Sequence, residues 1–317
     1  MGHIDSKRRM CNKIWQGFHF FQSNLGPDFK PAVNFKADVT ASDLMDQWIL
    51  SRLSHMVMSC DTNFQDYKLH GVTESLQTFW INDFCDIYLE SVKAVLRENT
   101  SRANTVRQVM CFCIDTFVRA LSPFMPYLSE ELYQRLPMAT DRPESVCISS
   151  YPSIQHVSFL REKLEEAVST VKLLKTIILS AQVRYSIKSR TLPVVIQVND
   201  GELLQTLSDP SLVRTLQTLS KAGSVHLLSP HQAPPTGSLT LTPNSQLQVF
   251  LKLKGFLNPL KEIERLENKL KRLEKTMKNK SKRKKDNTAE FAKLQEERDS
   301  YIKEIADMKK YEMEQTE

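Results

Sequence analysis

The sequence contains little glycine and none of the common catalytic motifs. Eight of its 317 residues are glycine, about 2.5% against roughly 7% in average proteins, which favours helices over glycine-rich loops. It contains no G-x-x-x-x-G-K-[ST], G-x-G-x-x-G, G-x-S-x-G or H-E-x-x-H. It also has no run of eighteen apolar residues and no signal peptide. We therefore expect neither an independent enzyme nor a membrane protein.

The cysteines and histidines lack the spacing of a metal site. The six cysteines are Cys11, Cys60, Cys85, Cys111, Cys113 and Cys147, and no two of them form a C-x-x-C pair. No two histidines have ligand spacing either, so we expect no metal. The cysteines lie among apolar residues in helical patterns, which favours reduced, buried thiols in an intracellular compartment.

The net charge of +6 is unevenly distributed. Residues 258–285 carry 12 basic and 4 acidic residues, whereas residues 286–317 carry 5 and 10. One concentrated basic segment suits a polyanionic partner, although most charged runs only form a solvated surface.

The first 150 residues have the periodicity of an antiparallel helical bundle. A helix over 5–22 should end at the Gly26-Pro27 turn, and Ser42-Asp43 should cap a second helix. Ser122 should cap a short helix over 123–136, with Pro123 at its first position. The apolar stripes of the second, third and fourth long helices are Ile49, Leu53, Met56, Cys60 and Phe64; Val72, Leu76, Phe79, Trp80, Phe84, Ile87 and Val92; and Val106, Met110, Cys113, Phe117 and Leu121. Four such helices in succession bury these stripes in one core.

Residues 151–257 have the pattern of a small α/β subdomain. We expect helices over about 158–184 and 209–221. A β-branched run at 194–198 and an apolar run at 225–228 predict strands. The segment 229–245, rich in Pro, Ser and Thr, is expected to be a loop, and the alternation from Leu247 to Leu253 predicts a last strand.

Residues 258–317 have heptad spacing, which predicts an antiparallel coiled-coil hairpin. Its apolar positions are Leu266, Leu270, Leu273 and Met277 in one helix, and Leu294, Arg298, Tyr301, Ile305 and Met308 in the other. The turn should lie near Ser281–Asn287. The hairpin tip would then carry Lys278, Lys280, Lys282, Arg283, Lys284 and Lys285. The fold class is therefore mainly α, with a bundle over 1–150, an α/β subdomain over 151–257 and an arm over 258–317.

The strongest local signal is the string FWINDFCDIYLESVK at 79–93. Phe79, Trp80, Phe84 and Ile87 should face the core. Another side carries Asn82, Asp86, Glu90, Lys93 and Arg97 at spacings of four, four, three and four residues. Among the acids, Asp83, Asp86 and Glu90 are more simply structural or surface residues than catalytic ones, and Glu90–Lys93 suggests a weak surface pair.

This string resembles the bundle-helix motif of valyl-tRNA synthetases. CNKIW, MDQWILSRL, LSPFMPYLSEELYQRLP, SYP and the terminal heptads resemble further parts of that family in the same order. The resemblance implies a bundle that receives the anticodon stem-loop of the tRNA for valine, at Lys13, His19 and Phe20. It also implies an arm whose basic tip contacts the tRNA. His19 stands where the family has arginine, and the basic tip replaces an apolar, proline-containing stretch.

The resemblance also sets expectations about activity and location. The family's ATP-binding signatures do not occur in this sequence, and its editing domain precedes the region of resemblance. The chain is therefore expected to be a fragment, an isoform or a stand-alone module that is inactive alone. We expect no cofactor in this chain, although the family enzyme uses ATP and Mg²⁺, and we expect a monomer. The expected compartment is the cytoplasm, with the mitochondrial matrix as a close alternative.

Two points stay open from sequence. Trp15 is expected in the core, whereas His19 and Phe20 suit a core or a stacking role equally. The basic tip could bind RNA phosphates or be a solvated loop. The alternative function is a non-catalytic coiled-coil adaptor whose basic tip binds an acidic protein partner.

Overall fold

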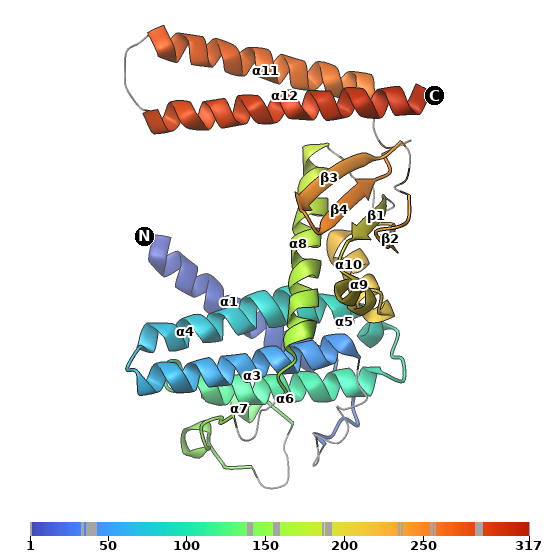
Figure 1. Ribbon diagram of the computed structural model, residues 1–317. Coiled ribbons are helices and arrows are strands. Elements are labelled where there is room, and N and C mark those ends of the chain that lie inside the picture. Colours follow the sequence, from blue (N-terminus) through green and yellow to red (C-terminus); the bar gives the residue numbers. More distant parts are fainter. Residues whose placement is uncertain are drawn as a thin grey trace. The chain divides into compact units, whose positions relative to one another are not determined.

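The computed structural model (Figure 1) describes residues 2–32, 35, 43–137, 142–154, 159–185, 187, 192–233, 235, 237–253, 256, 258–282 and 288–316. For residues 2–7, 279–282, 288–290, 307, 310 and 314–316 it describes the backbone alone. The chain forms two compact units. One comprises Met1–Val171 and Asp209–Leu219, and the other Lys172–Ser208 and Ser220–Glu317. Helix α8 (Glu162–Arg184) passes from the first unit into the second.

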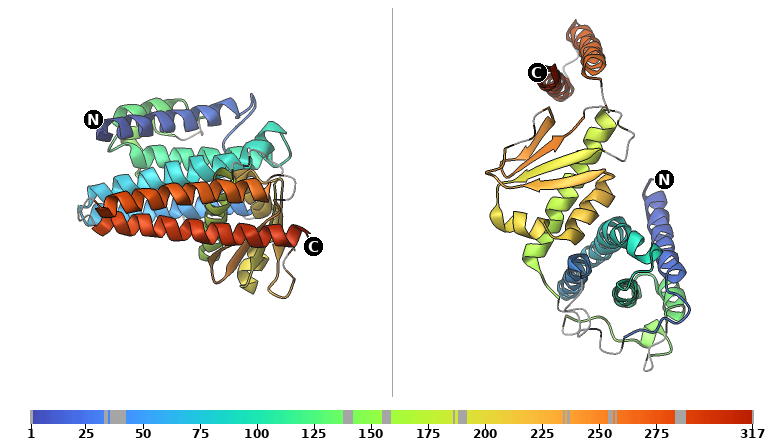
Figure 2. Two further views of the ribbon diagram at one scale, coloured as in Figure 1. Left: turned by 90° about the horizontal axis from the view of Figure 1, so that it is seen from above. Right: turned by 90° about the vertical axis from the view of Figure 1, so that its right-hand side faces the viewer.

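The first unit is a bundle of helices, as the sequence predicts. The helices α4, η1 and α5 follow one another without a break and form one rod. The bundle packs α1, α3 and α6 around this rod (Figures 1 and 2). Its elements are α1 (Gly2–Ser23), α3 (Leu44–Gln65), α4 (Leu69–Gln77), η1 (Thr78–Leu89), α5 (Glu90–Arg97), α6 (Ala103–Leu121), α7 (Pro126–Gln134), the 3₁₀ turn η2 (Val146–Ile148) and α10 (Pro210–Ser220). Asp43 caps α3 by accepting a hydrogen bond from the Met45 N–H, while Ser42 lies outside the described residues.

The predicted apolar stripes form the core of the bundle. Every predicted stripe residue except Phe64 is buried, and the half-buried Phe64 stacks on Phe124 at 5.9 Å between ring centroids. At the centre, the Trp80 ring lies 4.2 Å from the Phe117 ring and 5.0 Å from the Phe84 ring. Phe84 has no exposed surface, which confirms its predicted burial.

The rod contains a π-helix that the sequence does not predict. Over η1 the hydrogen bonds run from i to i+5, an arrangement usually confined to single turns. Its buried side chains recur every four residues, as the pairs 79–80, 83–84 and 87–88. This repeat exceeds the 3.6 residues of an α-turn, so a wider turn keeps these pairs facing the core.

Gly17 lets α1 approach the π-helix closely. A Cβ at this position would lie 3.1 Å from both the Cys85 Sγ and the Trp80 ring, closer than ordinary van der Waals contact. The Trp80 Nε1–H in turn donates to the Lys13 carbonyl at 3.4 Å. The small residue therefore fixes how α1 lies on η1.

Two sequence predictions for the bundle are wrong. The short helix begins at Pro126 rather than Pro123, because a residue before proline is disfavoured in helical geometry and Met125 is accordingly non-helical. Ser122 donates to the Arg119 carbonyl at 2.9 Å instead of capping a new helix. The thiols are not uniformly buried, since Cys11 and Cys85 are half-buried and Cys147 is exposed on the loop that holds η2.

The second unit contains a four-stranded sheet of order β2-β1-β4-β3. The strands are β1 (Pro193–Val198), β2 (Ser224–Leu228), β3 (Leu239–Asn244) and β4 (Leu247–Leu251). β1 pairs parallel to β2 and antiparallel to β4, and β4 pairs antiparallel to β3. Central β1 is buried from Val194 to Val198, as its β-branched run predicts.

The predicted loop 229–245 is wrong in its last third, where β3 forms. Leu239 is buried and Thr240 exposed, so the segment alternates as an edge strand does. Its neighbouring prolines and serines hid this short pattern. Helix α9 (Gly201–Leu207) was also missed; the Asp200 side chain caps it by accepting from the Leu203 N–H at 3.0 Å.

Helices α11 (Pro259–Lys282) and α12 (Thr288–Thr316) form an antiparallel hairpin. Figure 2 shows the two helices side by side along their length. Leu266, Met277, Ile305 and Met308 are buried between them, and the other predicted heptad residues are half-buried. An ion pair of 3.2 Å joins Lys309 to Glu267. No helix in the described part of the chain is long and apolar enough to span a membrane.

Candidate nucleic-acid interface

Two of the predicted site residues lie along one side of α1. Lys13, Gly17 and Phe20 are spaced by four and three residues, so they share a helical side. The Lys13 Nζ forms an ion pair with the Asp86 Oδ1 of η1 at 2.6 Å. This pair lies at the surface, with both side chains a little under half exposed.

The Phe20 ring lies beside a second ion pair. Lys93 of α5 places its Nζ 5.9 Å from the centroid of the half-buried Phe20 ring, within cation–π range. The same ammonium group forms an ion pair with Glu90 at 2.5 Å, which confirms the predicted Glu90–Lys93 pair. We call Lys13, Phe20, Asp86, Glu90 and Lys93 the paired face.

His19 and Trp15 lie on other sides of α1. His19 is exposed, and its Nδ1 is 3.5 Å from the Ser23 Oγ. The prediction that Trp15 lies in the core is wrong, since the residue is half-buried. Its ring lies at the surface under the Arg135 guanidinium, 5.2 Å from the ring centroid. The structure therefore brings Lys13 and Phe20 together with residues of η1 and α5, while His19 faces solvent on another side of α1.

The thiol beneath the paired face has no catalytic character. Burial raises the pKa of Cys85 to about 12, and the nearby Lys13 only partly offsets this. A thiol with so high a pKa stays protonated and is a poor nucleophile. Cys85 is therefore a protonated thiol that packs against Gly17.

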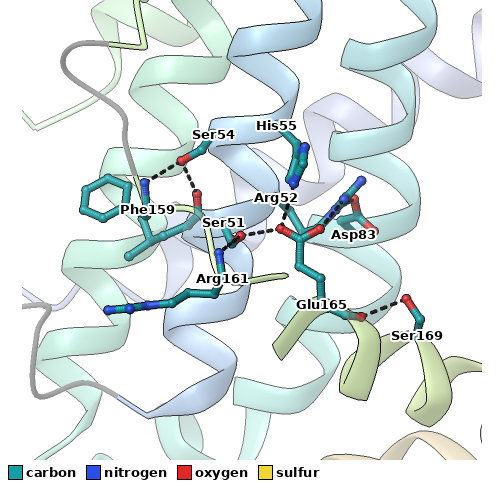
Figure 3. Close-up of polar contacts among 10 residues, drawn as sticks. Ser51, Arg52, Ser54, His55, Asp83, Phe159, Arg161, Glu165 and Ser169 are labelled. Carbon is teal, nitrogen blue, oxygen red and sulfur yellow. Dashed lines mark hydrogen bonds and ion pairs between the residues drawn. The ribbon is translucent and has the colours of Figure 1, made fainter. Parts of the chain in front are cut away.

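A buried polar cluster holds the bundle together on another side of the rod. Figure 3 shows Glu165, in the first turn of α8, accepting from Ser51 and pairing with Arg52 and His55 of α3. Arg52 reaches Asp83 of the π-helix at 2.9 Å as well. Burial opposes the charge of Arg52, but its two carboxylate partners raise its pKa. Every carboxylate here has a partner, so the cluster is structural and leaves no free acid for catalysis.

A second buried acid is also structural. Asp46 accepts from the Tyr88 hydroxyl at 2.7 Å and pairs with Arg102 at 2.9 Å. Burial raises the pKa of the Asp46 carboxyl, and the attraction of Arg102 lowers it only in part. Such a residue fixes α3 against the rod and α6.

The outer side of α11 is strongly basic. Its exposed cations are Lys261, Lys271, Arg272, Lys275 and Lys278, which we call the basic face. Among the described residues no carboxylate forms an ion pair with any of them, and Glu264 is the one exposed acid of α11. The cations repel one another and contribute nothing to packing between the helices.

The predicted tip residues are only partly described. Lys278 is exposed, and Lys280 and Lys282 are in the last turn of α11 by their backbone. Arg283, Lys284 and Lys285 lie outside the described residues. Within the described ranges no three His, Cys, Asp or Glu side chains are grouped as metal ligands.

Sequence reasoning missed that Asp86 and Lys93 complete the surface around Lys13 and Phe20. The signal was present in the spacing of Asp86, Glu90 and Lys93 on one side of the rod. What the spacing could not tell was which helix would lie against that side. The close approach at Gly17 decides this.

Comparison with known proteins assigns the class of domain first. Residues 46–197 match the family described as the anticodon-binding domain of tRNA ligase. The matched residues include α4, η1, α5 and α6 of the bundle, and with them Asp86, Glu90 and Lys93 of the paired face, whereas α1 with Lys13 and Phe20 precedes them.

The particular family follows from whole-chain similarity. The chain is 36% identical over 275 residues to the mitochondrial valine–tRNA ligase of Mus musculus, covering 85% of this chain and 25% of that protein. It is 32% identical over 276 residues to the valine–tRNA ligase of Takifugu rubripes, covering 84% of this chain and 22% of that protein. The chain belongs to the valine–tRNA ligase family. It spans about a quarter of the length of the curated relatives it matches.

Proposed function

We propose that the chain is the tRNA-binding region of a valine–tRNA ligase and that its partner is the tRNA for valine. The match of residues 46–197 to an anticodon-binding domain carries this proposal. The relatives that match some 85% of the chain are named valine–tRNA ligases, which is why we propose the tRNA for valine rather than that for another amino acid.

The anticodon loop would bind beside α1. Bases of a single-stranded loop can stack on aromatic rings and hydrogen-bond along their edges. Phe20 supplies such a ring, Lys13 supplies a polar group on the same side of α1, and His19 would supply another from the adjoining side of the helix. His19 would take the position of the arginine usual in this family.

The hairpin would bind the phosphate backbone. Five exposed cations on the outer side of α11 form a linear positive surface, and phosphate contacts need no more than such a surface. The proposed contact continues to the tip through Lys280, Lys282, Arg283, Lys284 and Lys285. The three regions 1–150, 151–257 and 258–317 would thus act as anticodon binder, connecting subdomain and arm.

Aminoacylation itself would be carried by residues outside this chain. The 317 residues contain no ATP-binding signature, so ATP and Mg²⁺ would bind elsewhere in a full-length family member. We propose that the chain alone is monomeric and holds no cofactor. We also propose the cytoplasm as its compartment, with the mitochondrial matrix, named for several relatives, as the alternative.

The test is binding of the purified chain to the valine tRNA and to a second tRNA over a range of salt concentrations. We expect preference for the valine tRNA and an affinity that falls steeply with salt. Binding to neither tRNA would contradict the proposal. If an acidic protein were bound instead, the adaptor function would replace it. Valine-dependent ATP–pyrophosphate exchange should be absent in material free of host synthetase.

A further inference from the structure

Two carboxylates stand in the middle of a surface proposed to bind RNA. Asp86 and Glu90 are four residues apart on the rod, and their side chains are 47% and 44% exposed. Residues four apart on a helix lie on the same side, so the two carboxylates are neighbours. Exposed carboxylates repel phosphate groups, so their presence here requires an explanation.

The fold itself does not supply that explanation. Each carboxylate is held by one lysine, Asp86 by Lys13 and Glu90 by Lys93. Exposed pairs of this kind contribute little to stability. The buried acids Asp46 and Asp83, by contrast, hold helices together in the core.

The pairing changes what the surface can bind. The two lysines and two carboxylates of the paired face cancel one another, so these residues attract phosphate less than the unpaired cations of the basic face do, although the exposed Arg97 follows on the same side of the rod. The paired face retains an aromatic ring, since the Lys93 ammonium that pairs with Glu90 also lies over Phe20. A surface of paired charges with a ring, hydrogen-bond donors and acceptors next to one another suits the edge of a nucleobase.

The carboxylates limit which base fits. An ionised carboxylate only accepts hydrogen bonds, so its partner must donate. The exocyclic amino groups of cytosine, adenine and guanine donate two hydrogens, whereas uracil has no amino group and donates only from its ring N–H. We infer that Asp86 and Glu90 are specificity residues that accept hydrogen bonds from the amino group of an unstacked anticodon base lying against Phe20. This inference rests on the proposed function and adds to it the chemical group that is recognised.

The experiment uses an anticodon stem-loop RNA in which each amino-bearing loop base is replaced singly, cytosine by uracil, adenine by purine and guanine by hypoxanthine. Affinity is measured for the full chain and for the double variant Asp86→Leu, Glu90→Met, whose side chains cannot accept a hydrogen bond. We expect at least one replacement to weaken binding to the unaltered chain about tenfold or more. In the double variant the same replacement should change affinity less than twofold.

The matched control is Glu74→Met, which removes an exposed carboxylate and its acceptor oxygens from α4 in the same rod. This control variant should still bind the unaltered stem-loop more tightly than the replaced ones, by the same factor as the unaltered chain does. Circular dichroism should show that all variants remain helical, because the altered side chains are exposed. Single variants then assign the effect to Asp86 or Glu90.

The outcomes separate this inference from the proposed function. No binding of the stem-loop by the unaltered chain would overturn the proposed function. Binding with equal affinity for all replaced loops would overturn the inference alone, as would discrimination that survives the double variant. In either of the last two cases the two ion pairs are solvated surface contacts.

Discussion

Both the paired face and the basic face carry lysines, but the lysines of the two faces differ in whether a carboxylate pairs with them. On the paired face, Lys13 and Lys93 each form an ion pair with a carboxylate of the rod. On the basic face, the five cations have no carboxylate partner among the described residues. Counting positive residues would rate both surfaces as RNA-binding. Counting their partners separates the two surfaces, and we propose that the paired face binds a base and the basic face binds phosphates.

This difference has a measurable consequence. Phosphate contacts release counterions, so each contributes to the dependence of affinity on salt. A lysine already neutralised by a carboxylate has few counterions to release. The salt slope, meaning the slope of log affinity against log salt concentration, should therefore be set mainly by the cations of α11.

The largest expected effect is on the core below the paired face. Phe84→Ala should lower the free energy of unfolding by about 3–5 kcal/mol, because it leaves a cavity among packed aromatic rings. Chemical denaturation followed by circular dichroism measures this loss. The control is Phe291→Ala, at a ring that is 38% exposed on α12, which should cost far less. A loss below about 1 kcal/mol at Phe84 would show that this core is not closely packed.

The next effect concerns the basic face. Changing Lys271, Lys275 and Lys278 to Gln removes three exposed charges and keeps good helix formers. If each cation contacts one phosphate, the slope of log affinity against log salt should fall by about 2–3 units. Affinity near 0.1 M salt should then fall by about a hundredfold or more.

The control removes the same number of lysines from the other helix of the arm. Lys293, Lys303 and Lys309 of α12 are exposed, and the third pairs with Glu267. Their change to Gln should alter the slope by less than about one unit, the value of one contact. Equal losses from the two helices would mean that net charge alone matters and that α11 has no special face.

The sequence was informative where a pattern repeats over many residues. The stripes of α3, of the rod and of α6 were found because 3–4-residue spacing continues for several turns, and burial confirms them. Leu266 and Met308 likewise marked the seam of the arm. Short elements such as β3 and α9 were missed because five to seven residues hold too little periodicity.

The paired face could be predicted only in part, for a different reason. Lys13 and Phe20 were chosen by resemblance, and Glu90–Lys93 by spacing along one helix. The contact of Lys13 with Asp86 joins residues 73 positions apart and depends on Gly17 and the wide π-turn. No local pattern contains that information.

A smaller effect is expected at the ring of the paired face. Phe20→Ala should weaken binding of an anticodon stem-loop by about 1–3 kcal/mol, the usual contribution of one stacked base. The salt slope should stay unchanged, because no charge is removed. Isothermal titration at two salt concentrations measures both quantities. Unchanged affinity in a folded variant would assign Phe20 to packing against Lys93 instead.

The smallest expected effect comes from changing one lysine on each face and comparing the two variants. Lys13→Met and Lys275→Met each remove one positive charge, but only Lys13 has a carboxylate partner. Because that pair is exposed, Lys13→Met should change the free energy of unfolding by less than about 1 kcal/mol. The double variant Lys13→Met, Asp86→Leu removes the ion pair without leaving an unpaired carboxylate, so the slope of log affinity against log salt for tRNA binding should stay the same. Lys275→Met should lower the slope by about 0.7–0.9 units.

Salt titrations of the double variant and of Lys275→Met under identical conditions decide the matter. If the double variant lowers the slope as much as Lys275→Met does, Lys13 leaves Asp86 to bind a phosphate, and the two faces bind RNA in the same way.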